Sequence, residues 1–146
     1  MARVKLVEQA EYAFHYPVTI EPQHLSTGSH LGADNIILLA SAARADVFDS
    51  MGLTQADLGD GVTGIIITEI TVNYKAEGFL HDEIVIDTHF GAFTRHGFTA
   101  FQRIRRGEKV LAIAETGIVT FDYRSKKIAP VPERFLRTLA EHQSNT

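Results

Sequence analysis

The sequence predicts an α+β fold in which an antiparallel sheet curves around one long helix. The first observation is an apolar run at residues 36–40 that follows a polar, glycine-containing loop at residues 28–35. The second is the remainder of the chain after residue 61, which consists mostly of β-like stretches with little room for a helix between them. A helix that is apolar nearly all round needs a wide sheet to cover it.

Composition limits the possible classes of protein. The chain has 146 residues, of which 45% are hydrophobic, so we expect one globular domain spanning residues 1–146. A net charge of -4 argues against a broad nucleic-acid surface, and the chain has no cysteine for disulfides or thiolate ligands. No apolar stretch is long enough to cross a bilayer, and the first residues lack a signal peptide's apolar core. We therefore expect a cytoplasmic protein that binds neither nucleic acid nor membrane.

A strand is predicted at residues 14–21, because apolar and polar side chains alternate there. Pro17 has no N–H to donate to a neighbouring strand, so this strand is expected either to lie at a sheet edge or to be bulged at Pro17. The central helix is predicted over residues 33–51, and its first three turns are apolar nearly all round, which is typical of a buried helix. Gly52 follows as a helix-ending residue.

Four further strands and one short helix are predicted downstream. Gly107 supplies the turn between the third and fourth of these strands, and two prolines stop the last one. The final helix is expected to turn Phe135, Leu136 and Leu139 inward. The predicted strands span residues 62–76, 83–92, 97–106 and 109–122, and the helix spans residues 133–141.

The loop at residues 28–35 is the first candidate functional site. Free N–H groups at a helix start bind anions and stabilise the oxyanion that forms when a thioester carbonyl is attacked. His30 and Asp34 are four residues apart, so on a helix they would share one face. The alternative is purely structural, since Gly, Ser, Asp and Asn precede many helices as capping residues.

Five short segments, in this order and spacing, make the chain similar to the 4-hydroxybenzoyl-CoA thioesterase type of hot-dog protein over residues 14–132. This resemblance implies a hot-dog fold, with a curved antiparallel sheet of five to six strands around a long helix and a short C-terminal helix. It also implies an acyl-CoA thioesterase that uses no cofactor other than the coenzyme A of its substrate, and a homodimer or dimer of dimers. The segments are Gly28-Ser29-His30-Leu31, Ala43-Arg44, Met51-Gly52-Leu53, Tyr74-Lys75-Ala76 and Asp82-Glu83-Ile84-Val85-Ile86.

The chain departs from this family at its catalytic carboxylates. Many members carry Asp-x-Asp ahead of the loop, whereas His24 and Ser26 occupy those places here. Residues 28–34 are similar to the Gly-Gly-His-Leu-Gly-Asn-Asp of one subset, and in that frame Asp34 is the nearest carboxylate. Asp34 would then activate water or attack the carbonyl, with His24 as the alternative base.

The other loop residues are assigned to substrate. His30 would orient the thioester or donate a hydrogen bond to it, and the N–H groups of Leu31 and Gly32, with Ser26 beside them, would bind the oxyanion or substrate. The structural alternative makes His30 a hydrogen-bonded histidine of the fold and the helix-opening carboxylate a cap.

Basic residues on one hairpin suggest a place for the phosphates of coenzyme A. Arg95 and Arg105 are the candidates, because arginine binds phosphate in a bidentate manner, although a solvated strand face explains the same residues. The seven histidines are scattered without the spacing of a zinc site, so no metal is expected.

Two other functions remain open from the sequence. The loss of the usual carboxylates suits a non-catalytic acyl-CoA binding protein, and some hot-dog proteins are enoyl-thioester hydratases or dehydratases. The acyl chain is not determined by the sequence. A curved sheet with an exposed edge is expected to pair with a second copy, as a homodimer or a dimer of dimers.

Overall fold

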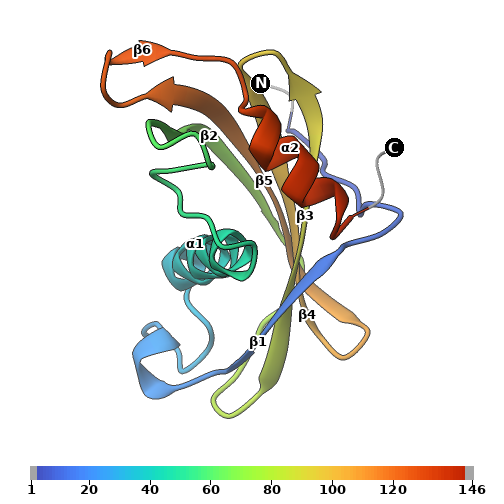
Figure 1. Cartoon of the computed structure of the whole chain (residues 1–146). Coiled ribbons are helices and arrows are strands. Elements are labelled where there is room, and N and C mark those ends of the chain that lie inside the picture. The colour runs from blue at the N-terminus through green and yellow to red at the C-terminus, as the bar shows by residue number, and fades with distance from the viewer. Residues whose placement is uncertain (1–2, 144–146) are drawn as a thin grey trace.

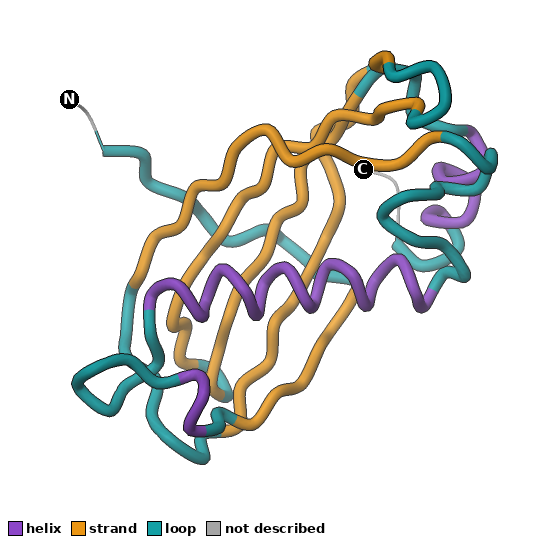
Figure 2. The backbone as a smooth tube through the Cα atoms, turned by 90° about the vertical axis from the view of Figure 1, so that its left-hand side faces the viewer, coloured by secondary structure: helices purple, strands orange, loops and turns teal. Residues whose placement is uncertain are grey.

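A computed structural model of the chain describes residues 3–143 and shows a six-stranded antiparallel sheet curved around one long helix. The strand order is β1-β3-β4-β5-β2, with β6 paired to β5. Figure 1 shows α1 in the hollow of the sheet, and Figure 2 shows that the helix runs across the strands and spans most of the width of the sheet. The elements are β1 (Phe14–Thr19), the 3₁₀ turn η1 (Pro22–His24), α1 (Ala33–Ser50), β2 (Thr63–Tyr74), β3 (Glu83–Thr94), β4 (Gly97–Arg106), β5 (Lys109–Asp122), β6 (Lys127–Ile128) and α2 (Glu133–Ala140).

The predicted fold class is confirmed, and most element boundaries agree to within two residues. The edge position inferred from Pro17 is also correct, because β1 pairs only with β3, with Pro17 opposite Val85. At the other edge lies β2, which pairs only with β5. Neither helix of residues 3–143 combines the length and apolar character that a membrane span requires.

The core fills the space between α1 and the concave face of the sheet in two clusters. One lies around the first half of α1 and includes Ile36 and Leu39 together with Ile86 of β3. The other lies around its second half, where Phe48 stacks on Phe90 with ring centroids 5.3 Å apart. The C-terminal helix α2 completes this second cluster with the expected Phe135 and Leu139, but Leu136 is 39% exposed and does not face inward.

The expectation that α1 is buried all round its first turns is wrong. Leu38 is 65% exposed, because the sheet covers only one side of the helix. On the same open side, Ile70 and Tyr74 of the edge strand β2 are 44% and 50% exposed. The apolar character of α1 therefore reflects two surfaces, a core face and an exposed face that continues onto β2.

The opposite, convex face of the sheet is crossed by the N-terminal segment, residues 3–13, which Figure 1 shows on the side away from α1. Asn73 holds this segment, since its side chain accepts from the Leu6 N–H at 2.7 Å and donates to the Val4 carbonyl at 3.1 Å. Leu6 and Tyr12 are buried there, and the Tyr12 ring lies under the Arg103 guanidinium at 4.5 Å. No sequence pattern predicted that this segment, called the N-terminal strap below, packs against the sheet.

Candidate active site

The loop that precedes α1 is held by backbone hydrogen bonds to itself and to the β2–β3 connection. Ser26 donates its N–H to the His30 carbonyl at 2.9 Å, and Ser29 takes a positive φ of 60°, which makes the turn compact. An isolated bridge pairs His30 with Phe79. The loop therefore has a defined conformation, as a site that positions substrate requires.

The expected oxyanion donors are already occupied. The N–H of Leu31 donates to the Gly78 carbonyl at 2.7 Å, and the N–H of Gly32 donates to the His24 carbonyl at 3.0 Å. These bonds fix the loop, so the assignment of these two N–H groups to the oxyanion does not hold in this structure.

Free donors lie immediately after them. The first hydrogen bond of α1 runs from the Ile36 N–H to the Gly32 carbonyl, and Gly32 has no side chain to cap the helix. The N–H groups of Ala33, Asp34 and Asn35 therefore have no partner within residues 3–143, as is usual for a first helical turn. These three groups are the ones that can receive an anion or a developing oxyanion.

Tyr74, at the end of β2, adds a phenol to this helix start. Its hydroxyl donates to the Ala33 carbonyl at 3.1 Å. Burial raises the pKa of Tyr74, and the nearby Asp34 carboxylate raises it further. The structure thus brings the Asp34 carboxylate and a protonated phenol to the same helix opening, although no catalytic role was predicted for Tyr74.

A cavity of about 340 Å³ opens beside these groups. It combines an apolar floor with polar side chains from two distant segments, the helix-opening loop and the end of β2. The lining residues are His30, Leu31, Ala33, Ile36, Tyr74, Lys75, Ala76 and Glu77. Its size lies in the range that holds a small-molecule ligand.

Of the two histidines, His30 lines this cavity and His24 does not. The Nδ1 of His30 lies 3.3 Å from the Leu31 carbonyl, which can only accept, so a neutral ring that makes this bond carries its proton on Nδ1 and presents Nε2 as an acceptor. His24 instead holds the fold: its Nδ1 accepts from the Glu21 N–H at 2.9 Å, and its carbonyl accepts from the Asn35 amide at 2.9 Å. The geometry favours His30 for contact with substrate.

Ser26 contributes less than expected. Its hydroxyl donates to the His30 carbonyl over 3.4 Å, and the side chain is exposed outside the cavity lining. Asp34 is also exposed and lies in the first turn of α1. Asp34 is therefore accessible to a water molecule or a thioester at the helix opening.

The structure does not bring Arg95 and Arg105 together. Arg95 lies in the β3–β4 turn and Arg105 near the opposite end of β4, a separation of about 27 Å along the strand. Arg105 is also bound, because its Nε donates to Asp87 at 2.7 Å. Nearer to the cavity is Arg106, whose Nη1 donates to the carbonyl of Glu77, a lining residue, at 3.2 Å.

Asp87 is a buried charge that sequence reasoning missed. Its carboxylate is fully buried on the convex side and accepts from His15, Arg103 and Arg105 at 2.7 to 3.2 Å. Burial raises the pKa of Asp87, but these hydrogen bonds outweigh burial and hold it below its ordinary 3.8. Because the group is satisfied and faces away from α1, we assign it to stability rather than catalysis.

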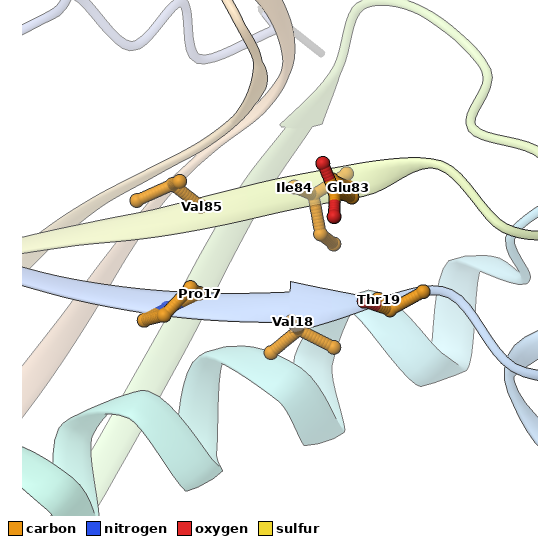
Figure 3. A pocket seen from close by; sticks show the side chains of 6 residues that line it. All are labelled: Pro17, Val18, Thr19, Glu83, Ile84 and Val85. Carbon is orange, nitrogen blue, oxygen red and sulfur yellow. The ribbon is translucent and has the colours of Figure 1, made fainter.

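A second hollow of about 330 Å³ lies over the β1–β3 edge. Figure 3 shows its lining, in which Val18 points toward α1 and Glu83 supplies the one titratable side chain. A lone carboxylate without a partner group does not form a catalytic arrangement. Among residues 3–143, no three His, Cys, Asp or Glu side chains are grouped so as to hold a metal ion.

Comparison with known proteins decides the family. Residues 20–139 match the model of the thioesterase-like superfamily, which covers the helix-opening loop and every strand of the sheet except β1. The chain belongs to the thioesterase-like superfamily. No curated protein matches this thioesterase-like chain in sequence.

Solved structures share the fold of this thioesterase-like protein at low sequence identity. A 1,4-dihydroxy-2-naphthoyl-CoA thioesterase from Synechocystis is 16% identical with a TM-score of 0.78, covering 88% of this chain and 96% of its own. A hypothetical protein from Staphylococcus aureus in complex with CoA is 14% identical with a TM-score of 0.80, and the match covers 97% of this chain and 92% of the Staphylococcus protein. A probable thioesterase from Escherichia coli is 16% identical with a TM-score of 0.75, and the match covers 88% of this chain and 98% of the Escherichia coli protein. These similarities establish the hot-dog arrangement.

Proposed function

We propose that this thioesterase-like protein hydrolyses acyl-CoA thioesters to a free acid and coenzyme A. The observation that carries the proposal is the set of unpartnered N–H groups at the start of α1, which open beside Asp34 and a cavity of about 340 Å³. Donors fixed in this way bind an oxyanion without reorganising during the reaction. Family membership and the CoA complex of the Staphylococcus aureus protein support the same substrate class.

The reaction follows from these positions. The thioester oxygen would accept hydrogen bonds from the N–H groups of Ala33 and Asn35. Asp34 would take a proton from a water molecule as that water attacks the carbonyl carbon. The tetrahedral intermediate then collapses, the carbon–sulfur bond breaks, and the thiolate of coenzyme A leaves and takes up the proton. Tyr74 and His30 would orient the thioester in the cavity.

For the phosphates of coenzyme A, we propose Lys75 and Arg106 in place of the arginine pair that the sequence suggested. Lys75 lines the cavity, and Arg106 contacts the carbonyl of Glu77 at its rim. Arg106 also pairs with Asp82 at 2.8 Å, which holds its guanidinium at this end of the sheet. Cations near the cavity mouth would bind phosphate while the acyl group enters the interior.

We also propose that the protein is a homodimer that joins at β2. This edge strand has no partner on its outer side within residues 3–143, and its Ile70 and Tyr74 are 44% and 50% exposed. Together with Leu38 of α1, they form an apolar surface that a second copy would bury. The N-terminal strap crosses the convex face, which favours a dimer over a tetramer built by stacking these faces. We place this activity in the cytoplasm, in keeping with a chain without cysteine.

Thioester turnover tests the function. Incubation with a panel of acyl-CoA substrates, followed by a thiol-reactive dye, should show release of free thiol. A change in enoyl absorbance without thiol release would instead indicate a hydratase. Tight binding of acyl-CoA by calorimetry, with neither signal, would indicate the non-catalytic binding protein. Light scattering in the same buffer measures the oligomeric state, and a stable monomer at micromolar concentration would contradict the proposed dimer.

A further inference from the structure

Arg44, on α1, is a buried cation with no carboxylate beside it. Its side chain is 5% exposed, and its hydrogen bonds run to two neutral groups, Gln55 Oε1 and Ser41 Oγ, each at 3.2 Å. No Asp or Glu of residues 3–143 lies within ion-pair distance of it. By contrast, Arg103 and Arg105 of β4 both pair with Asp87. A guanidinium has more donors than the two bonds use, and leaving such a group buried without an anion is unfavourable.

A narrow cavity of about 140 Å³ between α1 and β2 is lined in part by Arg44. Ile37, Ile70 and Val72 make its walls apolar, whereas Ser41, Thr116 and Arg44 provide polar groups at the Arg44 end. The space is too small for coenzyme A and suits a slender hydrocarbon chain.

This narrow cavity lies next to the candidate active site. Both cavities are lined by Ile36, and the lining residues of β2 pass from Tyr74 in the first to Val72 and Ile70 in the second. These three residues alternate along one strand, so they lie on the same face of the sheet. The hydrocarbon chain of an acyl group bound at the helix opening can therefore extend along α1 toward Arg44.

The length of this path follows from helix geometry. Arg44 reaches back to Ser41, and the rise from Asp34 to Ser41 is about 10 Å at 1.5 Å per residue. An extended hydrocarbon built from bonds of about 1.5 Å advances roughly 1.3 Å per carbon, so about eight carbons span this path.

We propose that the acyl group of the substrate ends in a carboxylate that pairs with Arg44, as in a dicarboxylic acid bound to coenzyme A through one of its two carboxyl groups, with a chain of about eight carbons. This inference rests on the proposed thioesterase function and adds the substrate class. A terminal carboxylate supplies the anion that Arg44 lacks, whereas a plain fatty acyl tail brings an apolar methyl group to a buried cation.

The test compares coenzyme A thioesters of octanedioic acid and octanoic acid, which have the same chain length. We expect kcat/KM to be at least about tenfold higher for the octanedioyl substrate, since a charge-assisted pair in a buried site is stronger than a neutral contact. In Arg44→Gln, which removes the charge and keeps hydrogen-bonding capacity, this preference should disappear. Arg137→Gln, which removes an exposed arginine on α2, should keep it. Equal rates for the two substrates in the parent protein, or a preference that survives Arg44→Gln, would overturn the proposal.

Binding of the free diacid separates this inference from the thioesterase proposal. Calorimetry with octanedioic acid should show binding to the parent protein and to Arg137→Gln, and loss of binding in Arg44→Gln. That result supports the Arg44 site even where no thioester is cleaved. If a carboxylate of a second copy already neutralises Arg44, the diacid will not bind and Arg44→Gln will weaken the dimer, which overturns the inference. A thermal melt of each variant confirms that it is folded.

Discussion

The Tyr74 hydroxyl donates a 3.1 Å hydrogen bond to the Ala33 carbonyl and so joins the last residue of β2 to the first residue of α1. The two residues are 41 positions apart in the sequence. This contact fixes the width of the cavity at the point where the helix N–H groups are free. Burial of the phenol raises the pKa of Tyr74, and the nearby Asp34 carboxylate adds to this shift.

Replacing Tyr74 with Phe should lower turnover of acyl-CoA roughly tenfold, because the helix opening loses its tether and an orienting hydroxyl. Stability should fall by only about 1 kcal/mol, the usual net value of one hydrogen bond. Tyr123→Phe is the matched control, since its hydroxyl also donates to a backbone carbonyl, that of Ile65, at 2.7 Å. Steady-state kinetics with urea melts should show a loss of activity in the first variant alone. Equal turnover in both would remove Tyr74 from the site.

Replacing Asp34 with Asn should reduce turnover by about a hundredfold or more, because it removes the base and keeps the size and most of the capping ability. Asp46→Asn removes an exposed carboxylate from the same helix and should leave turnover unchanged.

His24→Ala distinguishes the alternative base. We expect some loss of stability, since His24 accepts from the Glu21 N–H, and little loss of turnover per folded molecule. An inactive, folded His24→Ala together with a fully active Asp34→Asn would reverse the assignment.

Replacing Asp87 with Asn should destabilise the protein by about 3 kcal/mol at neutral pH, because it leaves buried positive partners without their anion. The pKa of Asp87 is depressed in the folded state, so its stabilisation is present above 3.8 and is lost as the pH falls through the lower, folded-state pKa. Urea melts should therefore show that the difference in free energy of unfolding between parent and variant becomes smaller in acid. Glu83→Gln, which changes an exposed residue on the same strand, should unfold with the same free energy as the parent protein.

His89 should make stability depend on pH in a higher range. Burial lowers its pKa below 6.5, although the Glu11 carboxylate opposes this shift, so the folded protein holds the imidazole neutral. The unfolded chain binds the proton below 6.5, and stability should fall as the pH decreases from 6.5 toward the folded-state pKa. His89→Gln should flatten this part of the stability curve, whereas the exposed His96→Gln should not. Identical slopes in all three proteins would contradict this account.

The sequence by itself determined the elements and the fold class. Alternating residues marked the strands, Pro17 marked an edge, and the glycine loop with its apolar run marked the start of α1 at residue 33. These features are local, because each depends on neighbours within a few positions of the chain. The same local pattern identified the helix opening as the candidate site.

Only the tertiary structure decided which groups of that site are free. Leu31 and Gly32 lost their assumed role because carbonyl groups elsewhere in the fold, including that of Gly78, accept their N–H groups. Tyr74 entered the site because β2 ends against α1. The burial of Arg44 without a carboxylate likewise depends on how α1 lies against the sheet. Hydrogen-bond partners and charge environments join residues distant in sequence, and a one-dimensional pattern carries no information on which of them meet.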